Sequence, residues 1–236
     1  MKKIFAALLM TAGLFALPAA ARADEHSAVW TGVDFGPSSE IDGYIGGLTA
    51  LGGQGVHDQG YQLRVGANYG RVRYDSTLSP SGRFTDRMFD GDLMVGYHAL
   101  SGPASASVFI GGDFADHRDS PVNDPSAHHG NRVGFKTQME INTALYGNLG
   151  LNAMGSYSTA FRTYWSRVDS TYRFGWFGIG PEVGFSGDQD YNQFRYGGTI
   201  GGSFGRVNLR LDGGAALTSG NRKDGAYGGA TVGTVF

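Results

Sequence analysis

The stretch Val207-Asn-Leu-Arg-Leu-Asp-Gly-Gly-Ala-Ala-Leu217 alternates between two kinds of residue. One parity carries apolar or small side chains, and the other carries Asn208, Arg210 and Asp212. Successive side chains of a β-strand point to opposite faces of the sheet, so this stretch predicts a strand with one apolar face and one charged face. The period is two residues, not the 3.6 residues of an amphipathic helix.

The same alternation recurs along the rest of the chain. It predicts twelve strands, at residues 28–36, 40–51, 59–74, 85–100, 103–116, 131–144, 148–160, 163–174, 176–186, 191–204, 206–218 and 225–236. Connections after even-numbered strands are mostly very short, whereas three connections after odd-numbered strands are long and polar, at residues 75–85, 117–130 and 219–224. Short periplasmic turns, longer outer loops and an even strand number are typical of outer-membrane barrels.

We therefore predict an all-β fold, a transmembrane antiparallel β-barrel of twelve strands with both ends in the periplasm. A periplasmic β-sandwich would also alternate and is the soluble alternative.

The composition excludes several classes of protein. The chain has 236 residues, including 40 glycines and no cysteine, and a formal net charge of −2. A chain without cysteine has no disulfide framework and no thiolate metal site. The balance of 19 basic and 21 acidic residues offers no basic face, so we expect no nucleic-acid partner.

The first residues resemble a secretory signal. Lys2 and Lys3 precede an apolar stretch from Ile4 to Ala21, and Ala21-Arg22-Ala23 fits the small-x-small cleavage rule. We expect a signal peptide at residues 1–23, Sec-type export through the inner membrane, and a single barrel domain at residues 24–236 in the cell outer membrane. A single membrane anchor is the alternative.

The predicted alternation directs fourteen charges into the lumen. They are Asp34, Arg64, Asp90, Asp92, Asp113, Lys136, Glu140, Arg167, Asp169, Arg173, Glu182, Arg195, Arg210 and Asp212. Both signs are present, which favours a cross-barrel ion-pair network over a selectivity filter, because a filter needs predominantly one sign. We expect Arg167, Arg173, Arg195 and Arg210 to pair with acidic residues on neighbouring strands. Eight strands leave a filled lumen and sixteen an open one, so twelve strands leave both states possible.

Four aromatic residues surround one connection at the outer end: Tyr157, Phe161, Tyr164 and Trp165. Aromatic rings beside Arg and Thr suit stacking on sugars, which makes this hairpin a candidate rim for a glycan or protein partner. An interfacial girdle is the structural alternative for Tyr157 and Tyr164. Trp165 has lumen parity, and both interpretations stay open for it.

No catalytic, metal or cofactor site is predicted. His128 and His129 lie in a long polar loop without metal-ligand spacing. A lipid-modifying barrel enzyme needs a serine and a histidine base on the lipid face, whereas Ser156, Ser158 and His98 are predicted to point inward or lie on the wrong strands. We therefore expect a protein that is not an enzyme.

Several short stretches carry a family resemblance. They are Trp30-x-Gly-Val-Asp34, Gly134-Phe-Lys136, Tyr157-Ser-Thr-Ala-Phe161, Thr163-Tyr-Trp-x-Arg167, Ile179-Gly-Pro-Glu182, Tyr191-x-x-x-Arg195-x-Gly197 and Asp224-Gly-Ala-Tyr-Gly-Gly229. In these stretches the sequence resembles the cellulose biosynthesis protein BcsS family of alphaproteobacterial outer-membrane barrels. The resemblance implies an accessory role in cellulose synthesis or secretion, with outer-membrane lipid and with cellulose or cellulose-secretion proteins as partners. It carries over no catalytic residue and implies no oligomeric state.

Two functional hypotheses follow. The first is a structural, docking or export-assisting component of a cellulose-secretion apparatus, and the second is a pore for small solutes or oligosaccharides. A cellulose conduit needs a line of inward rings, whereas Trp30, Tyr44, Phe109 and Trp165 are scattered. The sequence therefore argues against the barrel being the export channel itself.

Overall fold

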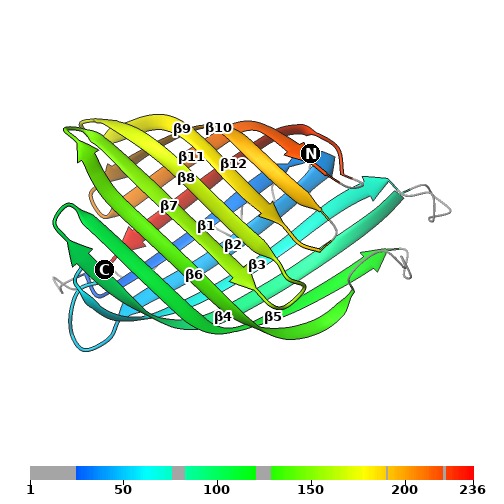
Figure 1. Ribbon diagram of the computed structural model, residues 1–236, viewed down its shortest axis with the longest axis horizontal. Helices are drawn as coiled ribbons and strands as arrows, with labels where there is room; N and C mark the ends of the chain where they lie inside the picture. The colour runs from blue at the N-terminus through cyan, green and yellow to red at the C-terminus, as the bar shows by residue number, and fades with distance from the viewer. Residues whose placement is uncertain (1–24, 76–82, 121–128, 190, 220–221) are drawn as a thin grey trace.

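The computed structural model describes residues 25–75, 83–120, 129–189, 191–219 and 222–236. They form one closed antiparallel barrel of twelve strands, in which every strand pairs with its neighbours in sequence and β12 pairs with β1 (Figure 1). This confirms the predicted fold. The strands are β1 (Ser27–Gly36), β2 (Glu40–Ala50), β3 (Gly60–Asp75), β4 (Arg83–Ser101), β5 (Ala104–Ser120), β6 (Gly130–Tyr146), β7 (Leu149–Ser158), β8 (Tyr164–Phe174), β9 (Phe177–Gly187), β10 (Asn192–Phe204), β11 (Val207–Thr218) and β12 (Gly225–Val235).

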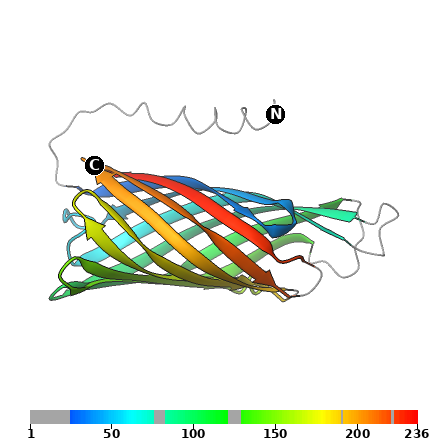
Figure 2. The same cartoon turned by 90° about the horizontal axis from the view of Figure 1, so that it is seen from above.

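The two ends of the barrel differ in their connections. At one end, which we call the turn end, the first strand begins and the last strand ends (Figure 2). Ser27 and Phe236 exchange backbone hydrogen bonds of 2.9 and 2.8 Å there, so the sheet closes without a free edge. Four two-residue turns at this end begin with Gly102, Gly147, Gly175 and Gly205, each at positive φ. Glycine takes this backbone conformation without steric cost, as primed hairpin turns require.

The opposite end, which we call the loop end, carries the connections after the odd-numbered strands. β3 to β6 are 16 to 19 residues long and project beyond the rest of the wall (Figures 1 and 2). β5 reaches Ser120, whereas the sequence predicted an end at residue 116. The outward side chains near the end of β5 are polar, as at Arg118, so no apolar alternation marks this part of the strand.

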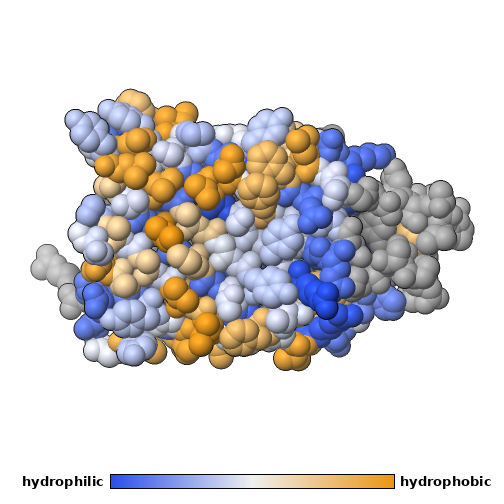
Figure 3. Space-filling view, in the orientation of Figure 1, coloured by the Kyte–Doolittle hydropathy of each residue, from blue (hydrophilic) through white to orange (hydrophobic). Residues whose placement is uncertain are grey.

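The outer face of the wall is apolar. Its exposed side chains include Val65, Leu93, Val95 and Ile110. Polar residues gather toward the loop end and apolar residues over the rest of the visible face (Figure 3). Aromatic pairs border the band at the turn end, where the ring centroids of Tyr61 and Tyr97 are 5.1 Å apart. This is the surface that a membrane-spanning barrel presents to lipid.

Glycines on the inner face make room for aromatic rings from the next strand. A Cβ atom on Gly46 would lie 2.3 Å from the Trp30 ring, and one on Gly96 would lie 2.3 Å from the Phe109 ring. The two rings therefore lie flat against the wall across these glycines. Inner-wall packing thus accounts for part of the high glycine content.

Pro181 interrupts one ladder without changing its register. β8 and β9 pair as Asp169 with Glu182 and Tyr172 with Ile179, and the two pairs between them are absent. The proline has no N–H to donate, which accounts for the local loss of pairing. Glu182 points inward in the ordinary register of the strand.

Some predictions lie outside the described residues. The signal peptide at residues 1–23 is one of them, and His128 is another. Within the described ranges, no helix has the length and apolar character needed to cross a membrane.

Candidate functional site in the lumen

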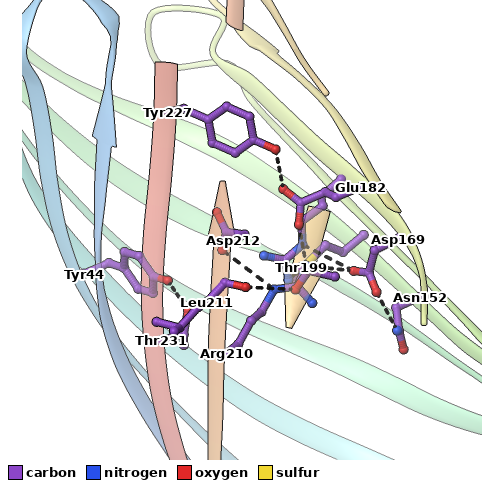
Figure 4. A network of polar contacts seen from close by, with 12 residues as sticks. Tyr44, Asn152, Asp169, Glu182, Thr199, Arg210, Leu211, Asp212, Tyr227 and Thr231 are labelled. Atoms are coloured by element: carbon purple, nitrogen blue, oxygen red, sulfur yellow. Dashed lines mark hydrogen bonds and ion pairs between the residues drawn. The ribbon is translucent and has the colours of Figure 1, made fainter. Parts of the chain in front are cut away.

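The first of two charged clusters is centred on Arg210 of β11. Its guanidinium donates to Asp169 Oδ1 on β8 at 3.0 Å and to a carboxylate oxygen of Glu182 on β9 (Figure 4). The side chains of Asp169 and Glu182 are only 1% and 5% exposed. One arginine therefore ties together three strands, and β8 and β11 are not neighbours in the sheet.

Further polar groups complete the hydrogen bonding of the two carboxylates. Asn152 Nδ2 donates to Asp169 Oδ2 at 2.8 Å, and the Tyr227 hydroxyl donates to Glu182 Oε1 at 3.3 Å (Figure 4). Arg167 Nε lies 3.8 Å from Asp169 Oδ1. Buried carboxylates persist in ionised form only when paired and hydrogen-bonded in this way.

The second cluster lies on β3, β4 and β6. Arg64 Nη1 donates to Glu140 Oε1 at 2.9 Å, and Lys136 Nζ donates to Asp92 Oδ2 at 2.7 Å. Gln138 Nε2 adds a 2.6 Å hydrogen bond to Glu140 Oε1. Both ion pairs skip at least one strand, because β3 does not neighbour β6 and β4 does not neighbour β6.

Arginines cover the faces of inward aromatic rings. The Arg64 guanidinium carbon lies 4.8 Å from the centre of the Trp30 ring and 5.8 Å from that of Phe109. Arg167 lies 5.5 Å from the centre of the Trp165 ring. A sugar that stacked on these faces would first have to displace a guanidinium group that is attracted to the ring.

A contact across several strands joins the two sides of the wall. Arg195 Nη2 of β10 lies 3.7 Å from Glu40 Oε1 at the start of β2. The same guanidinium lies 5.4 Å from the centre of the Tyr227 ring. Sequence reasoning missed Glu40 and Tyr227, because Glu40 begins its strand and glycines surround Tyr227. Both residues could have been identified by extending the inward alternation to the ends of every predicted strand.

A small cavity remains beside the Arg210 cluster. Its volume is about 20 Å³, and its lining includes Asp34, Trp165, Arg167, Arg195 and Asp212. This space holds about one water molecule. The enclosed space beside the cluster is therefore small.

At the loop end, the β7–β8 connection turns inward. Phe161 is 1% exposed, and its ring stacks on the His117 ring with centroids 4.2 Å apart. The Arg132 guanidinium lies 4.5 Å from the centre of the Phe161 ring. Phe161 and Arg162 both have φ of 53°, a left-handed conformation that directs the phenyl ring into the mouth instead of outward.

The predicted rim is therefore not one surface. Tyr157 points outward and is 45% exposed, and the Tyr164 hydroxyl donates to Asn192 Oδ1 at 2.5 Å. Phe161 is buried in the mouth, and Trp165 lines the cavity in the lumen. Tyr157 and Tyr164 are paired on the outer face, and Trp165 points inward because successive residues of a strand alternate in direction. The positive φ angles of the connection direct only Phe161 into the mouth. That this hairpin serves as a rim for a glycan or protein partner stays a prediction.

The remaining predicted charges are placed as follows. Asp90 Oδ1 lies 3.9 Å from His117 Nε2, and Asp212 Oδ1 lies 3.8 Å from Arg210 Nε. Arg173 is exposed at the turn end, where the described part of the chain gives it no ion pair. The expectation that all four arginines pair on neighbouring strands is therefore wrong. Arg210 and Arg195 reach beyond their neighbours, since the curved wall brings distant strands together.

The inner wall also holds a serine–histidine contact. His98 Nδ1 lies 2.7 Å from Ser107 Oγ, and both side chains are buried. They face the lumen and not the lipid, away from where a lipid-modifying barrel would need them. In the described residues, no group of three or more histidine or acidic side chains is arranged to hold a metal ion.

Solved structures share the barrel architecture. The KdgM porin matches with a TM-score of 0.50 and 8% identity, over 89% of this chain and 99% of that chain. The transport unit of the autotransporter AIDA-I from Escherichia coli matches with a TM-score of 0.50 and 10% identity, over 98% of this chain and 97% of that chain. A TodX deltaS2S3 mutant, a monoaromatic hydrocarbon channel, matches with a TM-score of 0.50 and 7% identity, over 90% of this chain and 91% of that chain. At these identities the likeness shows the fold alone.

No match was found among curated protein sequences. The family model described as cellulose biosynthesis protein BcsS matches residues 28–236, which include every strand of the barrel except the first residue of β1. The chain therefore belongs to the cellulose biosynthesis protein BcsS family.

Proposed function

We propose that this protein is a non-enzymatic barrel of the outer membrane that assists cellulose synthesis or secretion from outside the polymer's path. In this role the barrel is a structural or docking component, and its lumen is held shut by ion pairs. The family supports the link with cellulose biosynthesis. The barrel domain at residues 24–236, behind a signal peptide, is part of the proposal.

The observation that carries the proposal is the pair of charged clusters in the lumen. Arg210 joins β8, β9 and β11, and Arg64 joins β3 to β6. A passing glucan chain would have to break contacts between side chains that are mostly shielded from water. Breaking a buried ion pair by removing one partner costs about 3–5 kcal/mol, so such contacts favour a closed lumen.

The inward rings also argue against a conduit. Trp30, Phe109 and Trp165 each have a face covered by an arginine. Sugar stacking needs that face free. Of the rim residues, Tyr157 and Tyr164 pair directly across β7 and β8. They are the part of the rim that a glucan or secretion partner can reach from outside.

A pore for small solutes or oligosaccharides is the second candidate. The cavity beside Trp165, Arg167 and Arg195 favours it, because it offers a ring and two guanidinium groups to an anionic or hydroxylated solute. The cavity is smaller than such a solute, so the pore requires rearrangement of the clusters.

Two measurements on the same variants test the proposal. The neutralised variant combines Arg210→Met, Asp169→Asn and Glu182→Gln, so that neither of the two most buried carboxylates stays charged once Arg210 is removed. We expect low conductance in planar bilayers from the wild-type protein. In a strain that lacks the gene, we expect the wild-type and the folded neutralised variant to restore cellulose output equally.

Other outcomes would contradict the proposal. A stable, large conductance of the wild-type protein would establish the pore. A change of cellulose output in the folded neutralised variant would place the polymer in the lumen. Unchanged output on deletion of the gene would remove the link with cellulose.

A further inference from the structure

Three arginines oppose one another on the outer face of β3, β4 and β5. Arg71 is the direct cross-strand partner of Arg87, and Arg87 is that of Arg118. They share outward parity with Tyr69 and Phe89, which are 57% and 43% exposed. We call Arg71, Arg87 and Arg118 the arginine row.

The described residues compensate only part of the charge of this row. Asp116 Oδ2 accepts hydrogen bonds from Arg118 Nη2 at 2.7 Å and from Nε at 2.8 Å. Within the described ranges, Arg71 and Arg87 make no ion pair. Directly opposed residues in antiparallel strands have Cβ atoms about 4.5–5.5 Å apart, and like charges at that spacing destabilise the sheet. Among the described residues only Asp116 pairs with the row, so the row is suited to binding an external counter-anion.

The height of the row on the wall indicates where that anion lies. Tyr69 comes eight residues after Tyr61, which belongs to the aromatic pair at the turn end. In a barrel with tilted strands, eight residues of strand span about 20 Å along the barrel axis. This interval fits the apolar band of about 25 Å that such barrels present to lipid. Arg71 lies two residues after Tyr69 and its partner Arg87 lies two residues before Phe89, which is toward the loop end on both antiparallel strands. The row therefore lies at the depth of lipid headgroups.

We propose that the arginine row binds the phosphate groups of a phosphorylated, acylated glycolipid of the outer leaflet. The inference rests on placement in the outer membrane and goes beyond the proposed role in cellulose secretion. Guanidinium groups bind phosphate oxygens in a bidentate way and suit this ligand better than ammonium groups do. Acyl chains of the same lipid pack on the apolar residues below the row, such as Val65 and Leu93, which are 53% and 58% exposed.

The length of the row selects the headgroup. Two spacings of about 5 Å spread the three guanidinium groups over about 10 Å. A headgroup with two separated phosphates engages the whole row, whereas a single phosphodiester engages one end of it. Asp116 holds the Arg118 guanidinium in place and sets that end of the site.

The test compares two triple variants of the full chain in detergent. The first combines Arg71→Gln, Arg87→Gln and Arg118→Gln. The matched control combines Arg162→Gln, Arg206→Gln and Arg173→Gln, three arginines away from the row. The probes are bis-phosphorylated lipid A, mono-phosphorylated lipid A, phosphatidylglycerol and inorganic phosphate, with bound lipid counted by native mass spectrometry.

We expect the row variant to bind bis-phosphorylated lipid A at least tenfold more weakly than the wild-type and control proteins do. Without lipid, its unfolding midpoint in urea should equal or exceed that of the wild type, because the like-charge repulsion is gone. The single variant Arg87→Gln should also bind bis-phosphorylated lipid A more weakly than the wild type does. It keeps the test valid if the triple variant folds poorly.

Three results would overturn the proposal. Equal lipid A binding by the row variant and the wild type would remove the site. Equal binding of phosphatidylglycerol and bis-phosphorylated lipid A would show a general anionic surface. Full competition by inorganic phosphate would show a free-anion site and not a lipid site.

Discussion

At the residue scale, the interior depends on a few arginines that each serve several partners. Arg210 holds both Asp169 and Glu182, and Arg64 contacts Glu140 and two aromatic rings. A shared cation lowers the number of side chains that must be ordered for each ion pair. Asp169 and Glu182 are nearly shielded from water, and Arg210 is the cation nearest to each of them.

Replacing Arg210 by Met should therefore lower the free energy of unfolding by about 3–5 kcal/mol, because the buried Glu182 loses its cation and Asp169 loses the nearer of its two. Arg173→Met is the matched control, since Arg173 is exposed at the turn end. Urea unfolding of the folded proteins in detergent, followed by tryptophan fluorescence, measures the free energy of unfolding of both variants. Equal midpoints for the two variants would contradict the assigned role of Arg210.

At the element scale, glycines determine how closely neighbouring strands and their rings pack. On β2, the inward Gly46 lies under the Trp30 ring, whereas a Cβ atom on the outward Gly43 would meet nothing nearer than 4.0 Å. Two glycines of the same strand thus have opposite tolerance for a side chain. The inner wall accepts large rings only where the adjacent strand has no Cβ atom.

Gly46→Ala should destabilise the barrel by about 1–3 kcal/mol, because the added methyl group displaces a ring that has no free space to enter. Gly43→Ala should be close to neutral, and it serves as the control on the same strand. The tryptophan emission spectrum, to which Trp30 contributes with Trp165 and Trp176, and the urea midpoint report the displacement of the ring and the loss of stability. A spectrum and midpoint of Gly46→Ala that match those of Gly43→Ala would show that the ring does not lie against Gly46.

At the scale of the whole molecule, one closed wall separates two electrostatic environments. The clusters in the lumen are largely shielded, with Asp169 1% exposed and Glu182 5% exposed. The exterior pair of Arg118 and Asp116 is accessible, with Arg118 75% exposed. Salt therefore screens the exterior charges far more than the interior ones.

Raising KCl from about 0.1 M to about 1 M shortens the Debye length from ~10 Å to ~3 Å. We expect the free energy of unfolding to change by less than about 1 kcal/mol, since the lumen pairs are largely shielded from the ions. Binding of lipid A to the arginine row should weaken over the same range. A large loss of stability in high salt would mean that the lumen is filled with electrolyte, in agreement with the pore and not with a closed barrel.

The strand pattern could be predicted because it is local. The alternation at residues 207–217 is a property of consecutive residues, and so are the turn glycines and the inward parity of Asp169, Glu182 and Arg210. Strand number, antiparallel order and the charged lumen followed from these signals alone. Strand ends were harder to predict, as at Ser120, because the apolar alternation fades where the wall leaves the lipid.

The contacts inside the barrel were decided by the tertiary structure. Arg195 meets Glu40 across β11, β12 and β1, and Phe161 turns into the mouth to stack on His117. No local sequence pattern encodes these contacts, since they depend on how the curved, staggered wall brings distant strands face to face. The sequence by itself thus determined which side chains enter the lumen. Only closure of the barrel decided which of them contact one another, because pairing across a lumen is set by the curvature and register of the wall and not by neighbouring residues.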